Sequence, residues 1–146
     1  MKTDIIIQIG SSGDITGIQN MHKIEFLSDH IRIEKRSIAL HKAIAQHLKA
    51  NPELLCIAKK NLKSWEEIYL MNSREFPAWL KQWNIILEQH PLDKIIQLIV
   101  SLSETARRLR QSSPFAGLLS QEERMKIYET FSIRTYYSRR RRYRPG

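Results

Sequence analysis

Apolar residues repeat with a helical period through most of this chain, and prolines and serines interrupt the repeat. Spacings of three or four residues place apolar side chains on one face of an α-helix. In one segment Leu40, Ile44 and Leu48 are four residues apart, and Asn51-Pro52 ends the pattern. Proline lacks the N–H that a helix interior needs, but it is tolerated in the first turn. The repeat therefore predicts a succession of helices.

The same signals predict where later helices begin and end. Helix starts are expected at Asn51, Ser73, Pro91, Ser101 and Ser120. The last two serines are each followed three residues later by a glutamate, which is the capping-box pattern. The helix before Pro114 ends there, because the residue preceding a proline avoids the helical region. Five to six helices with short connections predict an all-α fold, an antiparallel helical bundle over residues 29–133.

The segment from Phe76 to Leu87 is apolar over a wide arc of its expected helix. Trp79 and Trp83 are one turn apart, and Ile86 extends their stripe. Such a helix is either the centre of the bundle or partly a surface that binds another chain. We favour the central helix, because a bundle needs one.

Residues 1–20 differ from the rest of the chain. The β-branched run Ile5–Ile9 and the segment 15–18 flank a cluster of glycine, serine and aspartate at 10–14. That order is typical of a β-hairpin with a loop longer than two residues. We therefore expect a short N-terminal β-hairpin over residues 1–20.

The positive charge is concentrated at the C-terminus. The chain has 24 basic and 15 acidic side chains and a formal net charge of +9. Six of the arginines lie in residues 134–146, which contain no acid, so residues 1–133 carry 18 basic and 15 acidic side chains and a net charge of +3. Such a tail cannot bury a core and is expected to be disordered.

Arginine interleaved with tyrosine suits RNA or single-stranded nucleic acid, through phosphate contacts and base stacking. The tail can equally fit an acidic groove on a protein partner, or be a basic end without a specific role. The residues predicted to bind nucleic acid are Arg139, Arg140, Arg141, Arg142, Tyr143 and Arg144.

No catalytic pattern is found. The five histidines include no pair at the i+4 spacing of a metal site. The adjacent acids Glu66/Glu67 and Glu122/Glu123 point in different directions on a helix. The single cysteine, Cys56, excludes an intramolecular disulfide, and its apolar neighbours predict a buried thiol. We expect a cytoplasmic, non-catalytic protein without a metal or cofactor, and the apolar runs are too short to span a membrane.

The arginine-rich stretch within residues 102–124 begins like the first helix of a DNA-binding helix-turn-helix unit. Pro114 and Gly117 then lie where the recognition helix should run, which disfavours that motif.

Arg107, Arg108 and Arg110 cannot all face a core. A guanidinium can hold a carboxylate or a phosphate with two parallel hydrogen bonds, which favours contact with a partner. The alternative is that one of them pairs within the chain, with Glu104 or Glu123, while the others are solvated.

Four segments resemble a group of small helical bacterial proteins that act as antitoxin-like partners in toxin–antitoxin pairs: ALHKAIAQHL (39–48), NPELL (51–55), WLKQW (79–83) and RRLRQSSPFAGLLSQEER (107–124). The resemblance covers about residues 35–128. It implies a helical binding protein that neutralises a co-encoded toxin by direct contact, with DNA-binding autoregulation.

The cognate toxin would then contact Arg107, Arg108, Arg110 and Phe115. The alternative is a small DNA- or RNA-binding regulator that uses the tail and the helix at 103–111. Either protein can form a homo-oligomer.

Overall fold

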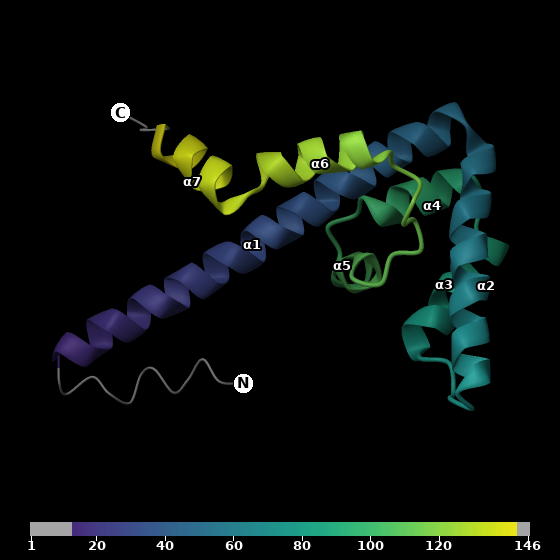
Figure 1. The fold of residues 1–146 in the computed structure, drawn as a ribbon, viewed down its shortest axis with the longest axis horizontal. Helices are drawn as coiled ribbons and strands as arrows, with labels where there is room; N and C mark the ends of the chain where they lie inside the picture. The colour runs from purple at the N-terminus through teal and green to yellow at the C-terminus, as the bar shows by residue number, and fades with distance from the viewer. Residues whose placement is uncertain (1–12, 143–146) are drawn as a thin grey trace. The chain divides into compact units, whose positions relative to one another are not determined.

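The computed structural model describes the backbone of residues 13–142 and the side chains of residues 27–139 (Figure 1). All regular structure in that part of the chain is helical, which confirms the all-α prediction. The elements are α1 (Gly13–Ala50), the 3-10 turn η2 (Pro52–Leu54), α2 (Leu55–Met71), α3 (Ala78–Gln89), α4 (Leu92–Ile99), α5 (Glu104–Arg110), α6 (Gln121–Thr130) and α7 (Ile133–Arg142).

The chain divides into two units, Met1–Lys35 and Arg36–Gly146. Helix α1 contributes its first part to one unit and residues 36–50 to the other. Within the second unit α2 packs against α3, α4 against α5, and α6 against α7. None of the helices in the described range is long and apolar enough to cross a membrane.

The core of the second unit is built around α3, as its wide apolar arc predicted. Leu80 and Trp83 are fully buried there, and Ile86 and Leu87 nearly so. The other residues of the buried cluster come from all the remaining elements between α1 and α5 except η2, and from the segment after α5: Ile44, Ala45, Leu48, Ala58, Leu62, Ile95, Ile96, Ile99, Leu109, Phe115 and Leu118.

Two of the predicted caps are confirmed. Asn51 Oδ1 accepts a hydrogen bond from Glu53 N at 3.2 Å, at the start of η2. Ser120 Oγ accepts one from Glu123 N at 3.1 Å, at the start of α6. Helix α4 starts directly after Pro91, which was also expected.

Two predicted helix starts were wrong. The N-cap of α5 is Ser103, whose hydroxyl accepts from Ala106 N, while Ser101 stabilises the preceding turn by accepting from Ser103 N. Helix α3 begins after Pro77 rather than at Ser73. A proline disfavours helical geometry in the residue before it, so a helix cannot easily run from Ser73 through Pro77.

The expected N-terminal hairpin is not found in the described residues. Residues 15–18 lie in α1, so the second predicted strand was wrong, whereas Ile5–Ile9 lies outside the described residues. Ile15, Ile18 and Met21 are three residues apart, a spacing that a helix also satisfies. The β-preference of isoleucine is weak enough for such a context to override it.

The C-terminal segment is a helix over most of the length that we predicted to be disordered. Helix α7 extends to Arg142. The Ser132 hydroxyl accepts from Thr135 N at 3.3 Å and caps the first turn. The consecutive arginines occupy the last turn, where positive charge interacts favourably with the helix dipole.

The thiol of Cys56 is exposed, which corrects the prediction of a buried cysteine. Cys56 lies two residues before Ala58, so the two residues are on different sides of α2, and Ala58 faces the core.

Candidate functional site

The segment Ser112–Leu119, which we call the corner, follows α5 and packs into the core. Phe115 is only 1% exposed. Its ring lies edge-on to Trp83, with centroids 5.8 Å apart, and edge-on to His41, with centroids 6.4 Å apart. The side chain of Phe115 is therefore an apolar anchor of the corner and is not exposed.

Three helices hold the corner and the end of α5 with polar side chains. From α1, His41 Nε2 lies 2.8 Å from Ser113 Oγ. From α2, Asn61 Nδ2 donates to the carbonyls of Pro114 at 2.7 Å and Ala116 at 2.9 Å. From α3, the indole of Trp83 donates to the carbonyl of Leu109 at 3.2 Å. These are the hydrogen bonds that a buried segment without regular structure needs.

His41 is neutral in this setting. Its Nδ1 lies 2.7 Å from the carbonyl oxygen of Ser37, which can only accept, so Nδ1 carries the proton and Nε2 accepts from the Ser113 hydroxyl. The pKa of His41 is lowered from 6.5 to about 4, chiefly because the ring is buried; the Ser37 hydrogen bond opposes this shift, and the positive charge of Arg110 adds to it.

Neither His41 nor Asn61 was predicted from the sequence as a functional residue. The spacing of His41 from Ala45 and Leu48, four and seven residues, is the signal that places it on the buried face.

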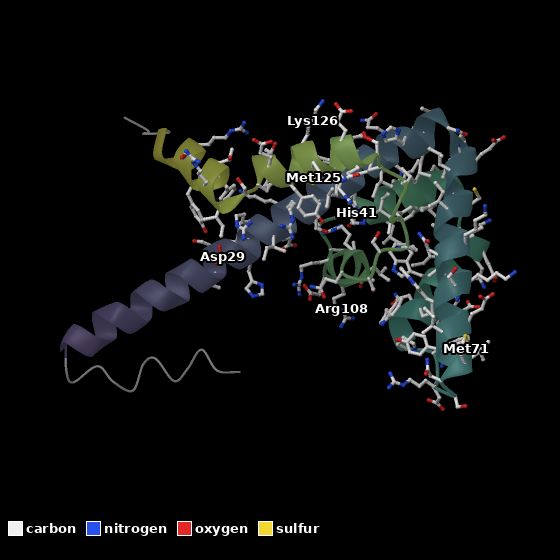
Figure 2. All side chains as sticks on the ribbon, in the orientation of Figure 1. Asp29, His41, Met71, Arg108, Met125 and Lys126 are labelled. Atoms are coloured by element: carbon white, nitrogen blue, oxygen red, sulfur yellow. The ribbon has the colours of Figure 1, made fainter. Side chains whose placement is uncertain are left out.

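The three arginines of α5 have different environments. Arg107 Nε donates to Glu104 at 3.0 Å, so the predicted internal pair is present, and this hydrogen bond is the main cause that lowers the pKa of the Glu104 carboxyl. Arg110 is 5% exposed and donates to the carbonyls of Ile99 and Ser101, which fixes the connection between α4 and α5. Only Arg108 of the three is exposed (Figure 2).

Of the four residues predicted to contact a partner at α5 and the corner, two are not at the surface. Arg110 and Phe115 are buried, so neither side chain lies at the surface, and the contact of these two residues with a partner stays a prediction. Helical spacing alone does not show that a side chain reaches the surface when the next segment folds over it. Glu123, the other acid considered as a partner for these arginines, lies 2.6 Å from His47 Nε2.

Helix α7 carries the largest concentration of positive charge. It contains five arginines and no acid, and the side chains of Arg134 and Arg139 are exposed. The backbone of residues 140–142 continues the helix, while Tyr143 and Arg144 lie outside the described residues.

An aromatic cluster attaches α7 to the end of α6. The rings of Phe131 and Tyr136 are 6.3 Å apart, and Tyr137 lies edge-on to Tyr136 at 5.3 Å. Tyr136 is 9% exposed. The arginines thus stand on a helix whose aromatic side is packed.

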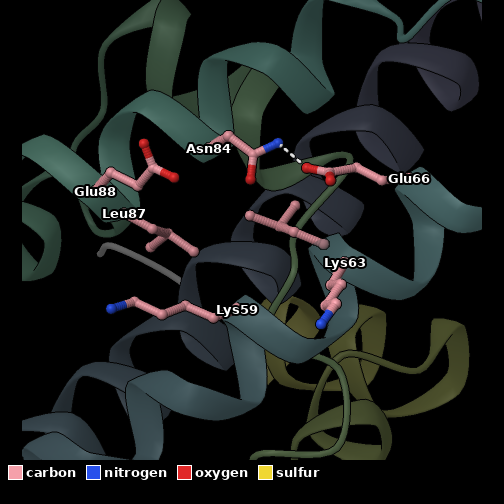
Figure 3. Close-up of a pocket in the computed structure, with 7 residues that line it drawn as sticks. Lys59, Lys63, Glu66, Asn84, Leu87 and Glu88 are labelled. Atoms are coloured by element: carbon pink, nitrogen blue, oxygen red, sulfur yellow. Dashed lines mark hydrogen bonds between the residues drawn. The ribbon is translucent and has the colours of Figure 1, made fainter.

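A groove of about 390 Å³ lies between α2 and α3 (Figure 3). Asn84 donates to Glu66 across it at 2.5 Å. Its lining residues are Lys59, Leu62, Lys63, Glu66, Asn84, Leu87 and Glu88. Two lysines and two glutamates offset one another, so the groove has no charge preference for an anion or a cation.

Among the described side chains no group of three or more histidine, cysteine, aspartate or glutamate residues is placed to hold a metal ion. Comparison of the chain with protein-family models, with curated proteins and with solved structures finds no match.

Proposed function

We propose that this chain is a non-catalytic nucleic-acid-binding protein, a small regulator that contacts the phosphate backbone through α7. The observation that carries the proposal is a ten-residue helix with five arginines and no acid, of which Arg134 and Arg139 are exposed. Arginine binds phosphate through a fixed fork of donors, and such contacts release counterions from the nucleic acid.

The low net charge of the rest of the chain supports α7 as the site that binds nucleic acid. Residues 1–133 have a net charge of only +3, and they include Arg107 and Arg110, which the chain uses internally. Helix α6, which precedes α7, offsets Arg124 and Lys126 with three acidic residues. The strongest attraction for a polyanion is therefore expected at α7 and the residues that follow it.

The test replaces the consecutive arginines of α7 with glutamine, which keeps helix propensity and removes charge. This α7 variant carries Arg139→Gln, Arg140→Gln, Arg141→Gln and Arg142→Gln. We expect the dissociation constant for a labelled 20-nucleotide probe, measured by fluorescence anisotropy as single strand and as duplex, to rise about 100-fold, because up to four phosphate contacts are lost.

The matched control removes four exposed positive charges from α2 and α3. This lysine variant carries Lys59→Gln, Lys60→Gln, Lys63→Gln and Lys81→Gln. We expect its affinity to stay within about threefold of the unmodified chain. These four lysines lie on α2 and α3, and salt screens exposed charges that are far from the bound phosphates. Equal losses in the two variants would contradict a site at α7.

Neutralisation of a co-encoded toxin is a second proposal, supported by the exposure of Arg108 on α5. Leu102, close to it in the sequence, is 78% exposed and offers an apolar contact. Co-expression of Arg108→Glu with the neighbouring reading frame tests it. Loss of a co-purifying complex that the unmodified chain forms is the expected result, and an unchanged complex would exclude Arg108 from the contact.

A further inference from the structure

Exposed apolar side chains gather in the last turn of α2. Leu70 is 65% exposed and Met71 83%, and Ile68 is exposed as well. Met71 lies at the very end of the helix, where the chain turns toward α3 (Figure 2). Single exposed apolar residues are ordinary on a protein surface, but several together mark a surface that contacts another molecule.

Aromatic rings support this turn from α2 and from the start of α3. Trp65 and Trp79 lie edge-on with centroids 5.6 Å apart, and Tyr69 and Phe76 with centroids 6.4 Å apart. All four rings are half-buried, and we call this region, residues 65–81, the tip. Aromatic residues and methionine are enriched at the centres of protein–protein interfaces, so the composition of the tip is that of such a centre.

The backbone of the tip is fixed by hydrogen bonds within the chain. Arg74 N donates to the carbonyl of Tyr69 at 2.9 Å, and Asn72 Nδ2 donates to the carbonyl of Ile68 at 2.8 Å. Ser73 has a φ of +52°, the left-handed conformation that closes a helix in a Schellman motif. A surface that is already ordered in the free chain loses little conformational entropy when it binds.

The charges around the tip indicate which molecule it fits. Two acids, Glu67 and Glu75, and two bases, Arg74 and Lys81, are exposed there, so the tip has no net charge. A polyanion or an anionic membrane gains no electrostatic attraction from such a surface. Two copies of this chain, each with a formal net charge of +9, repel one another least where their surfaces are neutral.

We infer that the tip is a self-association surface through which two copies of this chain form a dimer. In a two-fold interface the same patch meets itself, so it must carry both signs of charge for acids to face bases. Leu70 and Met71 form the apolar centre, and the acids of one copy face the bases of the other. This inference is independent of the proposed function, because it uses no residue of α7.

The first experiment is sedimentation equilibrium of the full chain, free of nucleic acid, at about 5–500 µM and about 0.3 M salt, which screens the repulsion between copies. We expect a reversible dimer with a dissociation constant of about 10–100 µM, because a small interface is a weak one. The tip variant Leu70→Gln with Met71→Gln should raise that constant at least about tenfold, while glutamine keeps helix propensity. The control Leu102→Gln, at another exposed leucine, should stay within about threefold.

The second experiment tests whether a copy of the chain is the partner. An acidic-tip variant carries Arg74→Glu and Lys81→Glu, and a basic-tip variant carries Glu67→Lys and Glu75→Lys. Each variant alone should dimerise at least about tenfold more weakly than the unmodified chain, because like charges then face one another. An equimolar mixture should form a heterodimer at least about tenfold tighter than either homodimer. Circular dichroism checks that both variants keep their helix content.

Three results would overturn this inference. One is a chain that stays monomeric up to about 500 µM, which includes the case that Leu70 and Met71 instead bind it to neutral phosphatidylcholine vesicles. Another is a dimer that the tip variant leaves unchanged, which places the contact elsewhere. The third is a mixture of the two charge variants that associates no better than each alone. None of these results changes the affinity for nucleic acid that is proposed for α7.

Discussion

At the scale of single residues, Phe115 and His41 show how far burial changes the role of a side chain. Phe115 is an anchor between two other rings, and His41 is a neutral hydrogen-bonding group between Ser37 and Ser113. Both lie in a part of the core where Arg110 is also buried. A proton added to His41 would therefore meet desolvation and a nearby positive charge together.

We predict that acid destabilises the protein through His41. Because its folded pKa of about 4 lies below the unfolded value of 6.5, the unfolded chain takes up the proton first as the pH falls. The stability is complete above 6.5 and is lost as the pH falls from there toward 4. The free energy of unfolding from urea denaturation should drop by about 2 kcal/mol between about pH 7 and pH 5.

The control variants are His41→Gln, which should remove this part of the pH dependence, and His90→Gln at an exposed position, which should retain it. An unmodified chain with equal free energies of unfolding at both pH values would contradict the neutral, buried state of His41.

At the scale of elements, the corner shows how an irregular segment is held by the helices around it. Gly117 has a φ of +88°, a left-handed conformation that favours glycine, and it reverses the chain between Phe115 and Leu118. On one side of that turn Asn61 satisfies two carbonyls. The corner thus depends on α2 for hydrogen bonds that it cannot make itself.

We predict that Asn61→Ala lowers the free energy of unfolding by about 1–3 kcal/mol, because it leaves the carbonyls of Pro114 and Ala116 without this donor. Asn84→Ala is the matched control, since Asn84 donates to Glu66 in a groove open to water, and it should cost less than about 1 kcal/mol. Urea denaturation of both variants measures the difference. A loss for Asn61→Ala no larger than about 1 kcal/mol would contradict the dependence of the corner on these hydrogen bonds from α2.

The order of the helices could be predicted from the sequence because it depends on local signals. Pro91 and Ser120 act through their own backbone neighbours, and both mark helix starts in the structure. The environments of Arg110 and Phe115 could not be predicted in this way. Phe115 packs against Trp83 and His41, which are distant in the sequence, and Arg110 donates to carbonyls of the preceding connection; helical spacing does not say which segment covers a face.

The helical form of α7 was missed for a related reason. Its composition has too few apolar residues to predict a fold, but one capping serine and one packed tyrosine ring, Ser132 and Tyr136, stabilise it.

At the scale of the whole molecule, the charge is divided between a nearly balanced body and a strongly basic end. Residues 134–146 hold six of the 24 basic side chains and none of the 15 acidic ones. A binding site that depends on phosphate contacts has an affinity that falls steeply with salt, and the steepness counts the contacts. The salt dependence of binding therefore measures how many arginines of α7 contact phosphates.

The most direct test is the slope of the logarithm of the association constant against the logarithm of salt concentration, for the full chain and a 20-base-pair DNA duplex. Five phosphate contacts from the arginines of α7 predict a slope of about −4.5. The α7 variant, with up to four contacts fewer, should give a slope of about −1, and the lysine variant should keep the original slope. Equal slopes for the unmodified chain and the α7 variant would contradict nucleic-acid binding through α7.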